Sequence, residues 1–221
     1  MNTICIILIL SCLFILGSSR PRVAIRVVAI QGIFLGMLPI VRSLHSLSLA
    51  ILILAFSGIL FKGIVLPLLM QTVVKQTGIQ RETDPIVPFS ASILIGVVLL
   101  GLSVWISTQM SLPERVSLLN TVSAMFLILV GLFLMITRRK ALMQTLAYLV
   151  MENGVYALGV SISLDFPLIV ELGILLDVFV GVFIMGNMLF HLDREFQHTD
   201  VDRFTELVET NKLNESGEVK P

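Results

Sequence analysis

The sequence predicts an all-α integral membrane protein of about seven transmembrane helices, and three observations lead to this prediction. Of its 221 residues, 56% are hydrophobic and 14% are charged, whereas a soluble domain usually carries about a quarter charged residues. The mean hydropathy is +0.99. The apolar residues form long runs separated by short polar segments, and Lys and Arg gather in alternate segments. A chain of this kind places its helices in a bilayer rather than in a soluble core.

Seven apolar runs can form helices that cross a bilayer, which takes about 20 residues per crossing. The first run is short, and a cleaved signal peptide is the competing interpretation. Because a basic n-region and an A-x-A-like cleavage site are absent, we expect a short first transmembrane helix. The expected helices are Asn2–Leu16, Arg22–Val41, Leu47–Val74, Phe89–Ser107, Val116–Ile136, Ala141–Ser163 and Pro167–Phe190.

Two of these runs contain residues that affect helix geometry. The second contains Gly32-x-x-x-Gly36, a spacing of small residues that permits close contact between helices. The third contains Lys62 and Pro67. Because proline lacks a backbone N–H and clashes with the preceding turn, we expect Pro67 to kink this helix and to free a backbone carbonyl near Gly63.

The distribution of basic residues predicts the orientation of the helices. Cytoplasmic loops of membrane proteins carry an excess of Lys and Arg. With seven helices, twelve of the fifteen Lys and Arg residues fall on one side, two fall on the other, and Lys62 lies within a helix. We therefore expect the N-terminus outside and the C-terminal tail in the cytoplasm. The twelve residues are Arg20, Arg22, Arg26, Lys75, Arg81, Arg138, Arg139, Lys140, Arg194, Arg203, Lys212 and Lys220.

Three ionisable side chains fall near the middle of their expected helices. At about 1.5 Å per residue, Lys62 lies ~18 Å into the third helix if its membrane span begins near Ala50. Glu152 lies ~16 Å into the sixth and Asp177 ~15 Å into the seventh. Glu171 lies nearer the outer end of the seventh helix. A charged group at a helix centre costs about 2.5–3.5 kcal/mol. We therefore expect the three central groups to converge inside a bundle rather than to face lipid.

Two interpretations of these groups stay open. In the first, Lys62 pairs with one carboxylate, the other carboxyl is protonated, and the network is structural. In the second, Lys62, Glu152, Asp177 and Glu171 form a lateral proton relay, because burial makes the protonation of each group depend on its neighbours. Intramembrane acids and bases are usually functional, which favours the relay. The expected supporting residues are Tyr148 and Tyr156, one turn either side of Glu152, with Asn153 and Pro67.

Several segments resemble membrane subunits of redox-driven ion pumps. From Arg138-Arg139-Lys140 through the two helices that follow, the chain resembles subunit K of respiratory NADH-quinone oxidoreductase. That subunit has three helices and a buried carboxylate in each of the last two. Asp177-Val178-Phe179-Val180-Gly181 is similar to the acid-plus-glycine segment of its third helix. At the first carboxylate position the chain departs from the pattern, because Leu149 falls there and Glu152 lies about one turn later.

The whole chain, from about Arg20 to Leu207, is more similar to hydrogenase-4 component E, a seven-helix protein whose last three helices resemble subunit K. We accordingly expect a four-helix membrane half over residues 1–114, a subunit-K-like three-helix unit over residues 115–192, and a polar cytoplasmic tail over residues 193–221. Four stretches carry the resemblance: Lys62–Leu68, Met151–Gly154, Leu168–Ile174 with Asp177, and the tail that contains Asp200.

The resemblance implies a non-catalytic membrane-arm subunit of a group 4 NiFe-hydrogenase, a formate hydrogenlyase or a related complex in the inner membrane of a prokaryote. The implied partners are antiporter-like membrane-arm subunits and the subunits of a soluble hydrogenase arm. The buried charges would contribute to proton translocation. Two alternatives are a C-type subunit of a multisubunit cation/proton antiporter, which has the same core helices but no redox partner, and a purely structural subunit.

Composition argues against several other classes. The net charge is zero, which gives no general basic surface for nucleic acid. His45, His191 and His198 are scattered, so no metal site is expected. The chain contains no motif for an iron–sulfur cluster, a nucleotide or a catalytic centre. We therefore expect no cofactor in this chain, and any enzymatic activity would belong to the parent complex.

Overall fold

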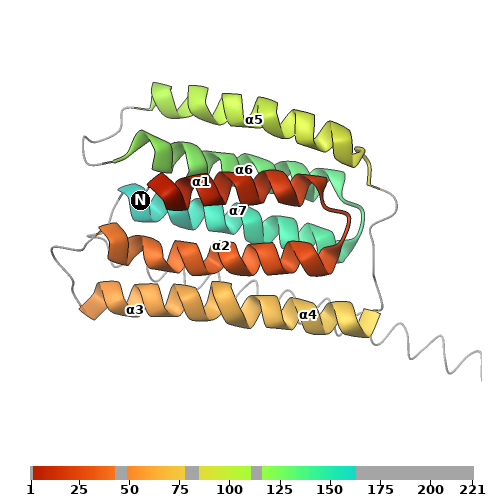
Figure 1. Cartoon of the computed structure of the whole chain (residues 1–221), viewed down its shortest axis with the longest axis horizontal. Helices are drawn as coiled ribbons and strands as arrows, with labels where there is room; N and C mark the ends of the chain where they lie inside the picture. The colour runs from red at the N-terminus through yellow and green to blue at the C-terminus, as the bar shows by residue number, and fades with distance from the viewer. Residues whose placement is uncertain (1, 43–48, 78–84, 111–115, 163–221) are drawn as a thin grey trace, which may run out of the picture. The chain divides into compact units, whose positions relative to one another are not determined.

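The computed structural model describes residues 2–42, 49–77, 85–110 and 116–162, and all regular structure in these residues is helical. The described helices lie side by side (Figure 1). They are α1 (Asn2–Gly17), α2 (Pro21–Arg42), α3 (Leu49–Gly58), the π-helical segment η1 (Ile59–Val65), α4 (Leu66–Thr77), α5 (Phe89–Gln109), α6 (Leu118–Thr137) and α7 (Ala141–Ile162).

Six of the seven expected helices fall within the described residues, apart from positions 47, 48 and 163, and are present with ends that differ by a few residues. The third expected helix is continuous through α3, η1 and α4. The seventh, Pro167–Phe190, lies outside the described residues, as does the expected tail. Within the described residues, four helices are long and apolar enough to cross a membrane, which indicates a membrane protein. They are Pro21–Val41, Ile51–Lys75, Phe89–Gln109 and Leu118–Thr137.

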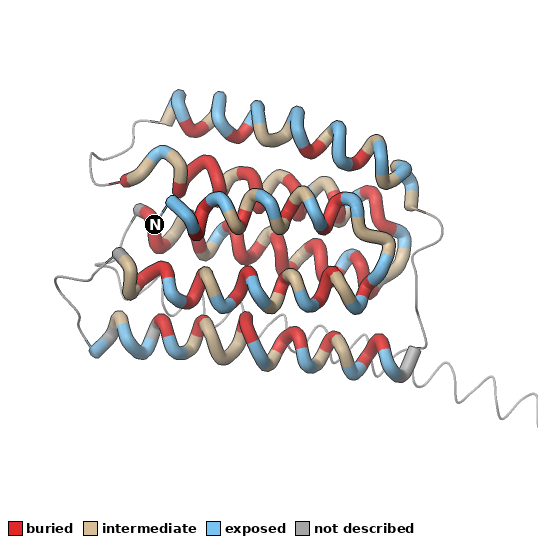
Figure 2. The backbone as a smooth tube through the Cα atoms, in the orientation of Figure 1, coloured by how far each residue is buried: buried red, intermediate tan, exposed pale blue. Residues whose placement is uncertain are grey.

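α1 and α7 are not among these four helices, for different reasons. α1 has 16 residues, fewer than the ~20 that a full crossing takes. α7 has 22 residues but carries Glu152 and Asn153 in its middle. Figure 2 shows that much of α7 is buried among its neighbours. Its polar residues are therefore shielded by other helices rather than by lipid.

α6 and α7 form the most extensive helix pair, and two glycines set their separation. A Cβ at Gly131 of α6 would lie 2.5 Å from the backbone nitrogen of Met151, and a Cβ at Gly154 of α7 would lie 2.7 Å from the carbonyl oxygen of Ala124. Both distances are too short for non-bonded atoms, so only glycine fits at either position. The two backbones touch just before and just after Glu152 on α7, which fixes the height and rotation of this helix.

α2 packs against the third span through the small-residue pair that the sequence singles out. A Cβ at Gly32 would lie 2.5 Å from the carbonyl oxygen of Lys62, and a Cβ at Gly36 would lie 2.7 Å from the backbone nitrogen of Ile59. The predicted close contact is therefore confirmed. Its partner is η1, the segment that contains Lys62.

The structure accommodates Pro67 in a way that differs from the predicted kink. Instead of bending, the helix widens one turn earlier into η1, where the Leu66 N–H donates to the carbonyl of Phe61, five residues back. α3 and α4 continue one another along the same line (Figure 1). The α-helical register would bring the Pro67 ring against the carbonyl of Gly63. The π-helical register relieves this clash. In other helices a sharp bend at the proline has the same effect.

The outward faces of the helices are apolar. α5 exposes Leu94, Val98 and Trp105 to 69%, 66% and 61% respectively, and Figure 2 shows exposed residues along its whole length. The residues that α5 buries are instead small, such as Ser92, Gly96 and Ser103. Soluble proteins bury large apolar residues and expose polar ones, whereas α5 exposes its large apolar residues. This arrangement is expected where lipid or an apolar neighbouring subunit takes the place of water.

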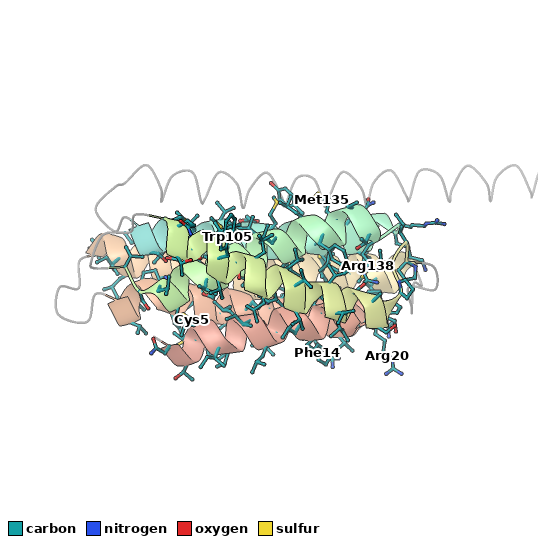
Figure 3. The ribbon with its side chains drawn as sticks, turned by 90° about the horizontal axis from the view of Figure 1, so that it is seen from above. Cys5, Phe14, Arg20, Trp105, Met135 and Arg138 are labelled. Carbon is teal, nitrogen blue, oxygen red and sulfur yellow. The ribbon has the colours of Figure 1, made fainter. Side chains whose placement is uncertain are left out.

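Arg138, in the basic loop between α6 and α7, is buried rather than solvated. Its guanidinium is 1% exposed, donates from Nη2 to the carbonyl of Leu16 at 2.9 Å, and lies 4.5 Å from the centre of the Phe89 ring. A cation at the C-terminus of α1 stabilises carbonyls that lack partners within the helix. Figure 3 shows Arg138 and Arg20 toward the same end of the helices, with Cys5 toward the other.

Candidate functional site

The structure brings Lys62 and Glu152 together at the same depth in the helix bundle. Lys62 lies eleven residues after the start of the span Ile51–Lys75 and thirteen before its end. Glu152 lies eleven residues after the start of α7 and ten before its end. With a rise of about 1.5 Å per residue, both residues lie roughly 15–20 Å from either end of their helices. This depth corresponds to about half the thickness of a bilayer core of roughly 30 Å.

Lys62 and Glu152 form a buried ion pair. The ammonium Nζ of Lys62 donates a hydrogen bond to Oε1 of Glu152. The two residues are 4% and 1% exposed, although ninety positions separate them in the sequence. Charged groups are excluded from apolar surroundings unless an opposite charge and hydrogen bonds compensate for the lost water. The pairing therefore explains how both groups are accommodated at this depth.

The aromatic ring of Tyr156 lies beside the ion pair. The Lys62 Nζ lies 5.3 Å from the centre of the Tyr156 ring, within the range of a cation–π interaction. The tyrosine Oη lies 3.3 Å from where a Cβ at Gly58 would be. The glycine at position 58 therefore leaves space for the phenol beside the third span. Tyr156, predicted as a supporting residue, does contact the ion pair.

Two backbone contacts hold the ion pair in register. On one side, Gly32 of α2 lies directly against the carbonyl of Lys62. On the other side, Gly131 of α6 lies against Met151, the residue before Glu152. A neighbouring helix thus packs on the backbone at or next to each residue of the pair: α2 at Lys62 and α6 beside Glu152. The π-helical geometry of η1 also rotates Lys62 relative to a regular helix, and such segments occur frequently at functional sites.

The other predicted site residues are placed as follows. Tyr148 is half-buried one turn before Glu152. Asn153 is 3% exposed, and its Nδ2 has no hydrogen-bond partner among the described residues. Pro67 lies in the first turn of α4, where it is associated with the π-helical segment. Asp177 and Glu171 lie outside the described residues.

Sequence reasoning did not single out two buried polar side chains that the structure places in the bundle. Gln31 is fully buried, and its Nε2 donates to Oγ of Ser11 at 2.6 Å. Asn120 donates from Nδ2 to Oγ of Ser161, and its Oδ1 accepts from the Cys5 thiol at 3.5 Å. A neutral amide within an apolar run is a weaker sequence signal than a charge. These groups form polar links from α1 to α2 and from α1 through α6 to α7.

The arrangement can hold one exchangeable proton inside the bundle. In the ionic form the proton is on Lys62 and the carboxylate is bare. Transfer of that proton along the hydrogen bond gives a neutral amine and a neutral carboxyl. If a second proton instead reached the Glu152 carboxylate, that group would become neutral and the ion pair would be lost. The Lys62 ammonium could then donate its proton to another acceptor. Such a pair therefore responds to charges that approach it, which is the property that a relay requires.

The fold and the site together define a helical membrane protein with an ion pair buried in the middle of its helix bundle. Comparison with known proteins finds one relative, described as uncharacterized protein Rv0085, from Mycobacterium tuberculosis strain ATCC 25618 / H37Rv. The two chains are 32% identical over 202 residues, which cover 90% of this chain and 92% of the relative. The chain therefore belongs to the same family as Rv0085. No family model matches the chain, and no solved structure matches it.

Proposed function

We propose that this protein is a non-catalytic membrane-arm subunit of a group 4 NiFe-hydrogenase or formate-hydrogenlyase-type complex, in which its buried charges take part in proton translocation. The observation that carries the proposal is the Lys62–Glu152 ion pair at the middle of the bundle. An ion pair at this depth is costly to insert. Neighbouring apolar residues could pack the same space without this cost.

The membrane topology is part of the proposal. We infer seven transmembrane helices in the cytoplasmic membrane of a prokaryote, with the N-terminus outside and the tail inside. Support comes from the apolar helices and from Arg20 and Arg138 at one end of them (Figure 3). The helix Pro167–Phe190 would be the seventh, and it would carry Asp177 and Glu171.

The proposed mechanism is a lateral relay. Lys62 and Glu152 exchange a proton as charge arrives from one side, and Asp177 accepts or supplies the next proton, with Glu171 toward the outer end. A soluble arm would perform the redox chemistry, and antiporter-like membrane subunits would be the neighbours that receive the charge. The resemblance to hydrogenase-4 component E supports these partners, and the ion pair supports a relay through this chain.

The C-type subunit of a cation/proton antiporter remains the second candidate, because the ion pair serves a redox-driven pump and an antiporter equally well. Purification of the tagged chain from its native membrane distinguishes the two. Hydrogenase subunits in the purified complex would exclude the antiporter assignment. A complex of antiporter subunits alone would exclude the hydrogenase assignment.

Neutral amides at the two central acids test the relay against a purely structural role. In Glu152→Gln and Asp177→Asn the side-chain shapes are retained while the titratable groups are lost. We expect each variant to assemble with its partners, since the amide oxygen in Glu152→Gln can still accept the hydrogen bond from Lys62. Each should lose proton translocation, measured with a pH-sensitive dye in inverted vesicles. If assembly and translocation both survive in both variants, the relay is wrong and the structural role holds.

A further inference from the structure

A cavity of about 200 Å³ at the helix ends is lined by three cations and one amide: Arg22, Arg26, Gln71 and Lys75. The cations come from the start of α2 and the end of α4, which pack against each other. All three have exposed side chains, and among the described residues none of them is ion-paired. Three like charges around one cavity repel one another, so an anion in the cavity would stabilise this arrangement.

The cavity lies at the level of lipid headgroups. Arg22 is the second residue of the span Pro21–Val41, and Lys75 is the last residue of the span Ile51–Lys75. Arg26 and Gln71 lie about one helical turn farther in, some 6–8 Å from the span ends. Long basic side chains at this depth extend toward the interface, where the phosphates of a bilayer lie.

The same helix faces continue into the membrane as apolar surface. Ile30 lies one turn below Arg26 on α2 and is 48% exposed, and Leu68 lies one turn below Gln71 on α4 and is 55% exposed. Residues four or three positions apart lie on one face of a helix. The cavity therefore has cations above and open apolar side chains below. This combination matches an amphipathic anion rather than a small soluble one.

We infer that this cavity binds the phosphodiester headgroup of an anionic phospholipid, whose acyl chains lie along the exposed faces of α2 and α4. Arg22, Arg26 and Lys75 supply the charge that selects a net negative headgroup, and the Gln71 amide donates to a phosphate oxygen. Basic pockets between transmembrane helices recognise lipid headgroups in this way. The inference is independent of the redox or antiporter role proposed above.

The test is lipid binding to the purified full-length chain in detergent, measured by native mass spectrometry. The probes are phosphatidylglycerol and phosphatidylcholine with identical acyl chains, so that only the headgroup charge differs. We expect phosphatidylglycerol to bind about tenfold more tightly or better. Equal binding of the two lipids would overturn the inference. Inorganic phosphate is added as a competitor, and if it displaces the phosphatidylglycerol the site is for a soluble anion, which also overturns it.

Two matched double variants locate the binding. Arg26→Gln with Lys75→Gln removes two cations from the cavity, and Arg20→Gln with Arg139→Gln removes two exposed cations outside it. We expect the first pair to weaken phosphatidylglycerol binding by about tenfold or more and the second to leave it within about twofold. Equal losses in both would mean diffuse attraction and would overturn the inference. If the first pair fails to fold, the lipid comparison on the unaltered chain decides.

Discussion

Lys62 and Glu152 stabilise each other, because the opposite charge of each offsets part of the cost of burying the other. Taking either ion out of water costs several kcal/mol, and the short hydrogen-bonded contact between them repays part of that cost. Removing one partner would leave a charge buried in the middle of the bundle. Removing both would leave a gap that apolar side chains can fill. Stability and charge transfer can therefore be separated experimentally at this pair.

We predict that the single variants Lys62→Met and Glu152→Leu each lower the free energy of unfolding by about 3–5 kcal/mol, the usual cost of breaking a buried ion pair. The double variant should recover most of this loss, since both charges of the pair are removed together. The measurement is equilibrium unfolding in mixed micelles. Additive losses in the double variant would show that the two side chains do not interact.

The depth of Lys62 and Glu152 could be predicted because helix rise converts sequence position into distance. Pairing of Lys62 with one of the carboxylates was among the expectations, but which carboxylate could not be predicted, because the sequence does not state which helices are neighbours. Arg138 shows the same limit. Its position in a basic loop suggests a solvated side chain, but the carbonyl of Leu16 and the ring of Phe89 enclose it. Those contacts come from segments more than 45 positions away in the sequence.

At the scale of helices, glycine positions decide how closely the elements approach. Gly131 and Gly154 bring α6 and α7 into backbone contact, and Gly32 brings α2 against η1. In lipid, association of helices depends on such close packing, because water no longer drives apolar surfaces together. The spacing Gly32-x-x-x-Gly36 was informative because both residues share a helix face. Gly131 and Gly154 lie on different helices and carry no comparable pattern.

We predict that Gly131→Ala and Gly154→Ala each destabilise the protein by at least about 2 kcal/mol, because the added methyl meets backbone atoms that cannot move independently. Gly101→Ala in α5 is the control, since among the described residues no atom beyond the local helix backbone lies within 4 Å of a Cβ there. It should be neutral or slightly stabilising, as expected for alanine in a helix. The check is the unfolding midpoint in detergent. A loss at Gly101 as large as that at Gly131 would contradict this packing.

η1 is the element whose form the sequence did not reveal. Pro67 predicted a departure from regular α-helical geometry in the third helix, and the π-helical segment is such a departure. A proline can be accommodated by a bend or by a widened turn, and local sequence does not choose between them. Here α2 packs along η1 through Gly32 and Gly36. This tertiary contact favours the straight, widened form and thereby sets the direction of the Lys62 side chain.

At the scale of the whole molecule, the apolar runs predicted the positions of the helices well because each run has polar ends. The proposed topology places the segment 43–48 outside and the segment 78–84 inside. We predict that single cysteines introduced at His45 and at Arg81, with Cys5 and Cys12 replaced by Ser, react differently with a membrane-impermeant thiol reagent. In intact cells the cysteine at position 45 should be labelled and the one at position 81 protected. The reverse pattern would invert the proposed orientation.

The proposed function requires that the buried pair moves protons and is not merely structural. Lys62→Met combined with Glu152→Leu tests this most directly, because it removes both titratable groups of the ion pair at once and leaves neither without the other. The measurement is proton translocation by the assembled complex in inverted vesicles. We predict a complex of normal composition whose translocation falls to the level of vesicles that lack this chain. Translocation at the level of the unaltered protein would contradict the claim.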